Sequence, residues 1–258
     1  MFETYLWLCL SAIAAGAINA VAGGGTLLTF PALFAALGTS AGASVMANAT
    51  STVALVPASL AAIWGYRREF IAIRRWALML AAPSLVGGFI GSALVIARPE
   101  SFKMAVPWLI LTAALLFAVQ PVVAHLTGIG RPRVHITWRG MLGAAVLQFL
   151  ISIYGGYFGA GIGILMLTSL AVMGLSDIHE MNALKSVLGT IINATSVVVF
   201  VANGTVDWPF AGAMALASIV GGYAGAHLSR RMNRRLVRWI VVGIGLTLAS
   251  YYFWRQAH

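Results

Sequence analysis

A lysine lies inside an apolar run that is predicted to span a membrane, Asn182–Ala202. Lys185 sits about one turn into this run, on a stripe of polar residues that recur at three- and four-residue steps: Asn182, Lys185 or Ser186, Gly189 or Thr190, Asn193 and Ser196. Ionisable side chains inside a bilayer are expensive and usually functional. A lysine among amide and hydroxyl donors suits an anion. Two structural interpretations stay open: Lys185 snorkels to the nearby interface, or the polar residues bond neighbouring helices.

A second predicted span, Ser44–Gly65, carries a comparable polar face, with Asn48, Ser51, Thr52 and Ser59, while Thr50 occupies the position of Lys185. The two faces correspond, but only one is charged. We therefore expect Lys185 to pair with the charge of an anion. The hydrogen-bond donors predicted beside it are Asn48, Ser51, Asn182, Ser186 and Asn193.

Glycine clusters interrupt two longer apolar runs, Gly23-Gly24-Gly25 in Tyr5–Leu37 and Gly159, Gly161 and Gly163 in Gly140–Met173. Each run has about 33 residues, so one straight helix would measure roughly 50 Å, against about 30 Å of bilayer hydrocarbon. We predict that each run forms two shorter helices, bent back at the glycines as a hairpin or re-entrant pair. Whether the arms fully cross stays open. Paired broken helices in two halves point to a transporter's binding site.

The half-helices predicted to begin after Gly25 and Gly163 would point their N-termini, with unpaired N–H donors, toward the midplane. Asn19, four residues before Gly23, is expected to face the first break, and Tyr157 takes the matching place in the second half. Glycines let the backbone approach a ligand closely. The break residues predicted to shape the site are Gly23, Gly24, Gly25, Gly161 and Gly163.

The six acidic residues all fall at span ends or in loops. This pattern argues against a buried carboxylate proton relay and against a site for a metal dication. Asp177 and Glu180 beside His179 could bind a metal or a proton, but a cap for the next helix is the simpler interpretation. The sequence contains no catalytic constellation and no cofactor motif. We expect no enzyme activity, no cofactor and no metal.

The chain of 258 residues is 60% hydrophobic and only 9% charged, which is typical of an integral membrane protein. Its formal net charge of +10 comes from arginines between the apolar runs. That arrangement is typical of cytoplasmic loops rather than of a nucleic-acid-binding surface.

The two halves look like a repeat, since Ser84–Gly91 matches Ser218–Gly225 at an offset of 134 residues.

If each broken run returns to its starting side, twelve Lys and Arg lie inside and three outside, as the positive-inside rule prefers. The predicted fold is an all-α integral membrane protein with two inverted repeats. Each repeat has a broken or re-entrant hairpin plus three transmembrane helices. The remaining spans are Trp76–Ala97, Phe102–Val123, Trp208–Leu228 and Leu236–Phe253.

We predict a first transmembrane repeat at 1–124, a basic cytoplasmic linker at 125–139 and a second repeat at 140–258. The Arg-rich loops expected in the cytoplasm are 66–75, 125–139 and 229–238.

These motifs resemble the sulfite exporter TauE/SafE family. In the first half, the resemblance rests on Asn-Ala-Val-Ala-Gly-Gly-Gly-Thr at 19–26, Pro31 and Ala-Asn-Ala-Thr-Ser at 47–51. In the second, it rests on Gly-Gly-Tyr-Phe-Gly-Ala-Gly-Ile-Gly at 155–163 and Asn-Ala-Leu-Lys-Ser at 182–186. The resemblance implies a multi-pass carrier of the bacterial inner (plasma) membrane for sulfite, sulfonates and related organosulfur anions.

The predicted function is secondary transport of a small anion, sulfite or an organosulfonate such as sulfoacetate, by alternating access. The anion would bind near the midplane between the repeats. Two other classes stay open: a passive anion channel, which would show no saturation, and a membrane scaffold or assembly protein, which would show no flux. The substrate, the direction of transport, a proton or other coupling ion and a homodimer also stay open.

Overall fold

The computed structural model describes residues 2–38, 40–126, 138–175, 177–228 and 234–257, which form helices and no strand. The helices of the first half are α1 (Phe2–Ala22), α2 (Thr26–Leu37), α3 (Ala41–Gly65), the short 3₁₀ helix η1 (Arg67–Glu69), α4 (Phe70–Ala97) and α5 (Pro99–Leu126). Those of the second half are α6 (Trp138–Tyr157), α7 (Ile162–Val172), α8 (Ile178–Ala202), α9 (Trp208–Leu228) and α10 (Arg234–Ala257). The all-α prediction is confirmed.

Both long apolar runs are broken at the predicted glycines. α1 has 21 residues and α2 has 12, so they measure roughly 32 and 18 Å. α6 and α7 repeat this pairing of a long arm with a short one, with 20 and 11 residues. α2 begins after Gly25, as predicted. α7 begins at Ile162 and not after Gly163, because the left-handed φ of +75° that ends the break belongs to Gly161.

The other predicted spans are also helices, each beginning somewhat earlier or at the predicted residue. Five segments are long and apolar enough to cross a membrane by length and composition: Phe2–Asn19, Ala41–Trp64, Arg67–Ala97, Pro99–Val122 and Ile178–Ala202. α2 and α7 belong to the shorter apolar helices. The molecule is therefore an all-α integral membrane protein.

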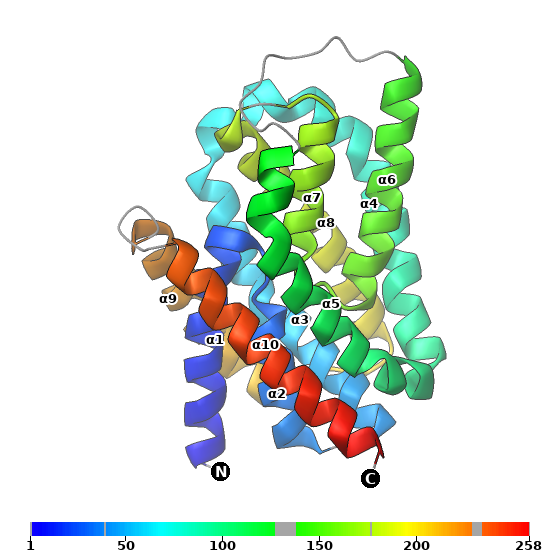
Figure 1. The fold of residues 1–258 in the computed structure, drawn as a ribbon. Coiled ribbons are helices and arrows are strands. Elements are labelled where there is room, and N and C mark those ends of the chain that lie inside the picture. Colours follow the sequence, from blue (N-terminus) through cyan, green and yellow to red (C-terminus); the bar gives the residue numbers. More distant parts are fainter. Residues whose placement is uncertain (1, 39, 127–137, 176, 229–233, 258) are drawn as a thin grey trace.

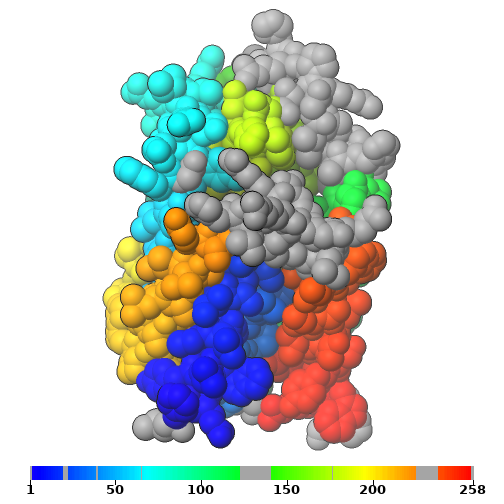
Figure 2. Space-filling model, turned by 90° about the vertical axis from the view of Figure 1, so that its left-hand side faces the viewer, coloured from blue at the N-terminus to red at the C-terminus, as the bar shows by residue number. Residues whose placement is uncertain are grey.

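Helices of one half pack against helices of the other. α1 lies against α9 (Figures 1 and 2), and α6 lies against α4 (Figure 1); α9 also packs on α3, and α4 on α8. Small residues make these contacts close. A Cβ on Gly91 would lie 2.1 Å from the Ile153 carbonyl oxygen of α6, and one on Gly221 would lie 1.9 Å from that of Ile13 in α1. The glycines of the repeated motif therefore pack helices.

Both chain ends lie at one end of the molecule, and the turn between α3 and α4 lies at the opposite end (Figure 1). α2 runs back toward the end from which α1 starts, so the first broken run is a hairpin. Most of the predicted basic linker (127–137) and residues 229–233 of the third Arg-rich loop lie outside the described residues.

Candidate functional site

The two glycine breaks meet at the centre of the molecule. The N–H of Gly163 donates a hydrogen bond to the carbonyl oxygen of Gly23, with an N···O distance of 3.3 Å. Gly23 has a left-handed φ of +72°, and a Cβ there would lie 2.9 Å from the Cα of Gly163. Only glycine suits this position, since it needs both a positive φ and a close backbone approach. The halves thus touch main chain to main chain.

Local contacts fix the shape of each break. In the first, the N–H of Gly23 bonds to the carbonyl oxygens of Ile18 and Asn19, at 3.3 and 3.1 Å. In the second, the hydroxyl of Tyr154 donates to the carbonyl oxygen of Ala160 at 2.6 Å. Each long arm therefore holds the loop that follows it.

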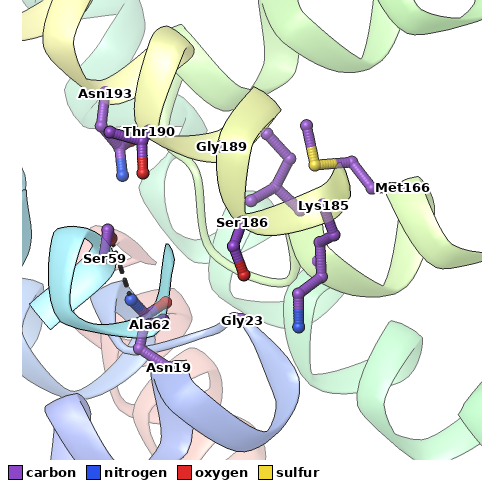
Figure 3. A pocket seen from close by; sticks show the side chains of 12 residues that line it. Asn19, Gly23, Ser59, Ala62, Met166, Lys185, Ser186, Gly189, Thr190 and Asn193 are labelled. Atoms are coloured by element: carbon purple, nitrogen blue, oxygen red, sulfur yellow. Dashed lines mark hydrogen bonds between the residues drawn. The ribbon is translucent and has the colours of Figure 1, made fainter. Parts of the chain in front are cut away.

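A cavity of about 50 Å³ opens beside this junction. It lies between α1, α3, α7 and α8, so both halves line it (Figure 3). A water molecule needs roughly 10–15 Å³, so the space suits a few waters or a small ion. Its lining residues are Asn19, Gly23, Ser59, Ala62, Ile162, Gly163, Met166, Lys185, Ser186, Gly189, Thr190 and Asn193.

Lys185 is the charged residue of this lining. Its side chain is only 6% exposed and runs from α8 toward the Gly23 break (Figure 3). Its Nζ donates to Oδ1 of Asn182 at 3.1 Å, and the Asn182 amide nitrogen donates to the carbonyl oxygen of Ile178 at 2.8 Å. A snorkelling ammonium would reach water, whereas this one is held inside the protein by a neutral amide. The burial of Lys185 argues against a snorkelling side chain.

Five neutral polar side chains line the same cavity. The hydroxyl of Thr190 is buried without a hydrogen-bond partner. Asn193 lies one turn further along α8, and the Asn19 amide nitrogen bonds to the Ser59 hydroxyl at 3.2 Å (Figure 3). Ser186, in contrast, donates its hydroxyl to the carbonyl oxygen of Asn182 at 2.8 Å. Figure 3 shows Thr190 and Asn193 at one end of the cavity and the Lys185 ammonium at the other, with Ser186 between them.

The short arm α7 does not present the row of unpaired N–H groups that the sequence predicted. The N–H of Ile162 bonds to the Gly159 carbonyl oxygen, that of Gly163 to Gly23 and that of Ile164 to Gly161. The tight turn at Gly161 and the contact between the halves use these donors. What α7 can still offer an anion is the positive end of its dipole.

Several predicted site residues lie away from the cavity. The Asn48 amide nitrogen donates to the Tyr157 carbonyl oxygen at 3.2 Å, and Ser51 shares a 2.5 Å hydrogen bond with Thr29. The Tyr157 ring packs against Phe102, with centroids 5.3 Å apart. The predicted residues that do line the cavity are Lys185, Ser186, Asn193, Asn19, Gly23 and Gly163; those that do not are Asn48, Ser51, Asn182, Tyr157, Gly24, Gly25 and Gly161.

Ser59 and Thr190 line the cavity but were not predicted as site residues. Both belong to the polar faces that the sequence reveals, so the signal was available. It could not be used, because the register of α3 against α8 decides which part of each face meets the break.

One acidic residue at the start of α8 has a structural role. Asp177 caps the helix, and its Oδ1 accepts from the N–H groups of His179 and Glu180 at 2.7 and 3.1 Å. Across the described residues, no three His, Cys, Asp or Glu side chains gather as a metal site.

Known proteins resemble this chain along almost all of its length. The family model "Sulfite exporter TauE/SafE" matches residues 8–252. A "Probable membrane transporter protein" of Haemophilus influenzae is 28% identical over 93% of this chain and 90% of its own. The "Probable membrane transporter protein YfcA" of Escherichia coli K12 is 24% identical over 93% of this chain and 86% of its own. The chain is a multi-pass membrane transporter and belongs to the sulfite exporter TauE/SafE family.

Proposed function

We propose that this protein transports a small oxyanion, sulfite or a small organosulfonate, and that the anion binds to Lys185 at the junction of the two glycine breaks. The observation that carries the proposal is a buried ammonium in a cavity between the halves, held by a neutral amide rather than by a carboxylate. Burying a charge without a counter-charge costs free energy. An anion that enters the cavity is therefore attracted to the Lys185 ammonium, which is paired with a neutral amide.

The neutral donors that share the cavity with Lys185 suit the oxygen atoms of such an anion. Charge-assisted hydrogen bonds from an ammonium, with a hydroxyl and an amide alongside, are typical of oxyanion recognition. The cavity of about 50 Å³ favours a compact ion such as sulfite over the longer sulfoacetate in this conformation.

Transport would proceed by alternating access, with the halves moving against each other around the bound ion. Support comes from reciprocal packing between the halves. The first helix of each half packs against a helix of the other half, α1 against α9 and α6 against α4, as expected for two related repeats. Our proposal includes the division at 125–139 and an inverted relation between the repeats. It also places the protein in a bacterial inner membrane with the Arg-rich loops in the cytoplasm.

The test is sulfite and sulfoacetate flux into proteoliposomes, for the wild type, Lys185→Ala and Lys185→Arg. A hydrogen bond to a charged group contributes about 1.5–3 kcal/mol. We therefore expect saturable sulfite flux, reduced at least about tenfold at low concentration by Lys185→Ala and less by Lys185→Arg. Equal flux for Lys185→Ala and the wild type would remove Lys185 from the site. Flux that does not saturate would identify a channel, and no flux of either ion would overturn the proposed substrate.

A further inference from the structure

A second cavity lies between α2, α5 and α10, away from the central site. Its volume is about 240 Å³, much larger than that of the central cavity. The residues that line it are Phe34, Lys103, Val106, Pro107, Tyr252, Arg255 and Gln256. It shares no residue with the site around Lys185.

Two cations from different helices meet at this cavity. Lys103, on α5, is half-buried, and Arg255 comes from the last turn of α10. The acidic residue nearest to Lys103 along the chain, Glu100, is exposed and does not line the cavity. In the charge-based topology this end faces outward and carries only three Lys or Arg residues, so two of the three converge on one cavity.

The walls of the cavity are well fixed. The Gln256 amide nitrogen donates to the carbonyl oxygens of Lys103 and Met104, at 3.2 and 3.4 Å, which ties the end of α10 to the start of α5. Tyr252 is 7% exposed, and its ring lies 5.6 Å from that of Phe34. A phenol can donate a hydrogen bond, so the cavity combines two cations with neutral donors and aromatic walls.

The surroundings place this cavity at the depth of lipid head groups. Trp108 and Trp254 are each 62% exposed, and Trp108 packs edge-to-face on Phe253, with ring centroids 4.9 Å apart. An exposed tryptophan at a helix end, such as Trp254 in the last turn of α10, is typical of a membrane–water interface. A guanidinium and an ammonium at that depth suit a phosphate group or a small oxyanion from the aqueous phase.

We infer that Lys103 and Arg255 form an oxyanion-binding site at the outer interface, separate from the transport site. Its ligand carries phosphate-like oxygens, either as the head group of an anionic phospholipid or as a free oxyanion. The cavity volume leaves room for the glycerol next to a lipid phosphate.

The experiment uses full-length protein with Lys185→Ala, so that the central site does not contribute to binding. The probes are sulfite and inorganic phosphate in lipid-free detergent, and phosphatidylglycerol added to the same sample. Binding is read from the shift in melting temperature and from lipid adducts in native mass spectrometry. The pocket variant is Lys103→Gln with Arg255→Gln. The matched control is Arg98→Gln, which removes the third outer cation, an exposed residue outside the cavity.

We expect at least one probe to bind and its apparent affinity to fall about tenfold or more in the pocket variant, with Arg98→Gln unchanged. Binding of phosphatidylglycerol alone would identify a lipid head-group site, and binding of sulfite or phosphate without lipid would identify a free-anion site. No binding of any probe, or equal binding by the pocket variant and Arg98→Gln, would overturn the inference.

Discussion

The Lys185 ammonium donates a hydrogen bond to the amide oxygen of Asn182. An amide stabilises a buried cation less than a carboxylate does, and it can be exchanged for an anion without leaving a buried negative charge behind. The arrangement fits the proposed role of Lys185 in binding and releasing an anion.

Thr190 provides a test of the cavity at the level of one hydroxyl. Thr190→Val keeps the shape of the side chain and removes a buried hydroxyl that has no hydrogen-bond partner. Since one neutral hydrogen bond contributes about 1 kcal/mol, we expect the KM for sulfite to rise about fivefold with little change in melting temperature. The measurement is concentration-dependent flux in proteoliposomes.

The control is Thr195→Val on the same helix, where the hydroxyl bonds to the Ile191 carbonyl oxygen and does not line the cavity. An equal rise in KM for both variants would show that Thr190 acts only through the helix and not through the anion.

The sequence predicted half of the site. It singled out Lys185, Ser186 and Asn193 from helical periodicity and Asn19 from its place four residues before Gly23, and these four line one cavity. It also grouped Asn48 and Ser51 with them, although these residues bond to Tyr157 and Thr29. Periodicity gives the polar face of one helix, but the position of that face along a neighbouring helix depends on tertiary packing.

The broken helices depend on a few backbone positions. Gly23, Gly159 and Gly161 have φ values of +72°, +78° and +75°, where other residues are strained. The sequence predicted both breaks from run length and glycine content. It placed the start of α7 two residues late, because three glycines in alternation do not reveal which one turns the chain.

Gly23→Ala tests the junction between the breaks. The left-handed φ alone costs about 1–2 kcal/mol with a side chain, and the new Cβ would lie 2.9 Å from the Cα of Gly163. We expect the melting temperature to fall by roughly 2–8 °C or more and sulfite flux to be lost. Thermal unfolding in detergent and flux of the same preparation provide the measurement.

Gly212→Ala serves as the control, since a Cβ there meets nothing within 4 Å and the residue lies within α9. Gly189→Ala adds a second comparison, because its methyl would enter the cavity without a clash. It is expected to lower sulfite affinity at unchanged stability. If Gly23→Ala unfolds and transports like Gly212→Ala, the junction does not matter.

The molecule as a whole has its described chain ends at one side and its α3–α4 turn at the other (Figure 1). The hairpins explain this layout, since α1 with α2 and α6 with α7 add two arms but no net crossing. For the arginines near the α3–α4 turn, the positive-inside rule predicts a cytoplasmic location.

Labelling of single cysteines tests this topology. Cys9 is first replaced by Ser, and Cys is then introduced at the exposed positions Glu3, Ala36 and Arg68. An impermeant maleimide applied to intact cells should label Glu3→Cys and Ala36→Cys, whereas Arg68→Cys should react only after permeabilisation. Labelling of Glu3→Cys and Ala36→Cys from opposite sides would mean that the first broken run crosses the membrane once.

The hydrogen bond between Gly163 and Gly23 has a consequence for how this protein can evolve. It joins the two halves through main-chain atoms alone, so no exchange of side chains can adjust it. The lining positions Asn19, Thr190 and Asn193 carry no such restriction. If the anion binds at this cavity as proposed, mutations in the lining can change which anion is bound while the main-chain bond between the halves stays the same.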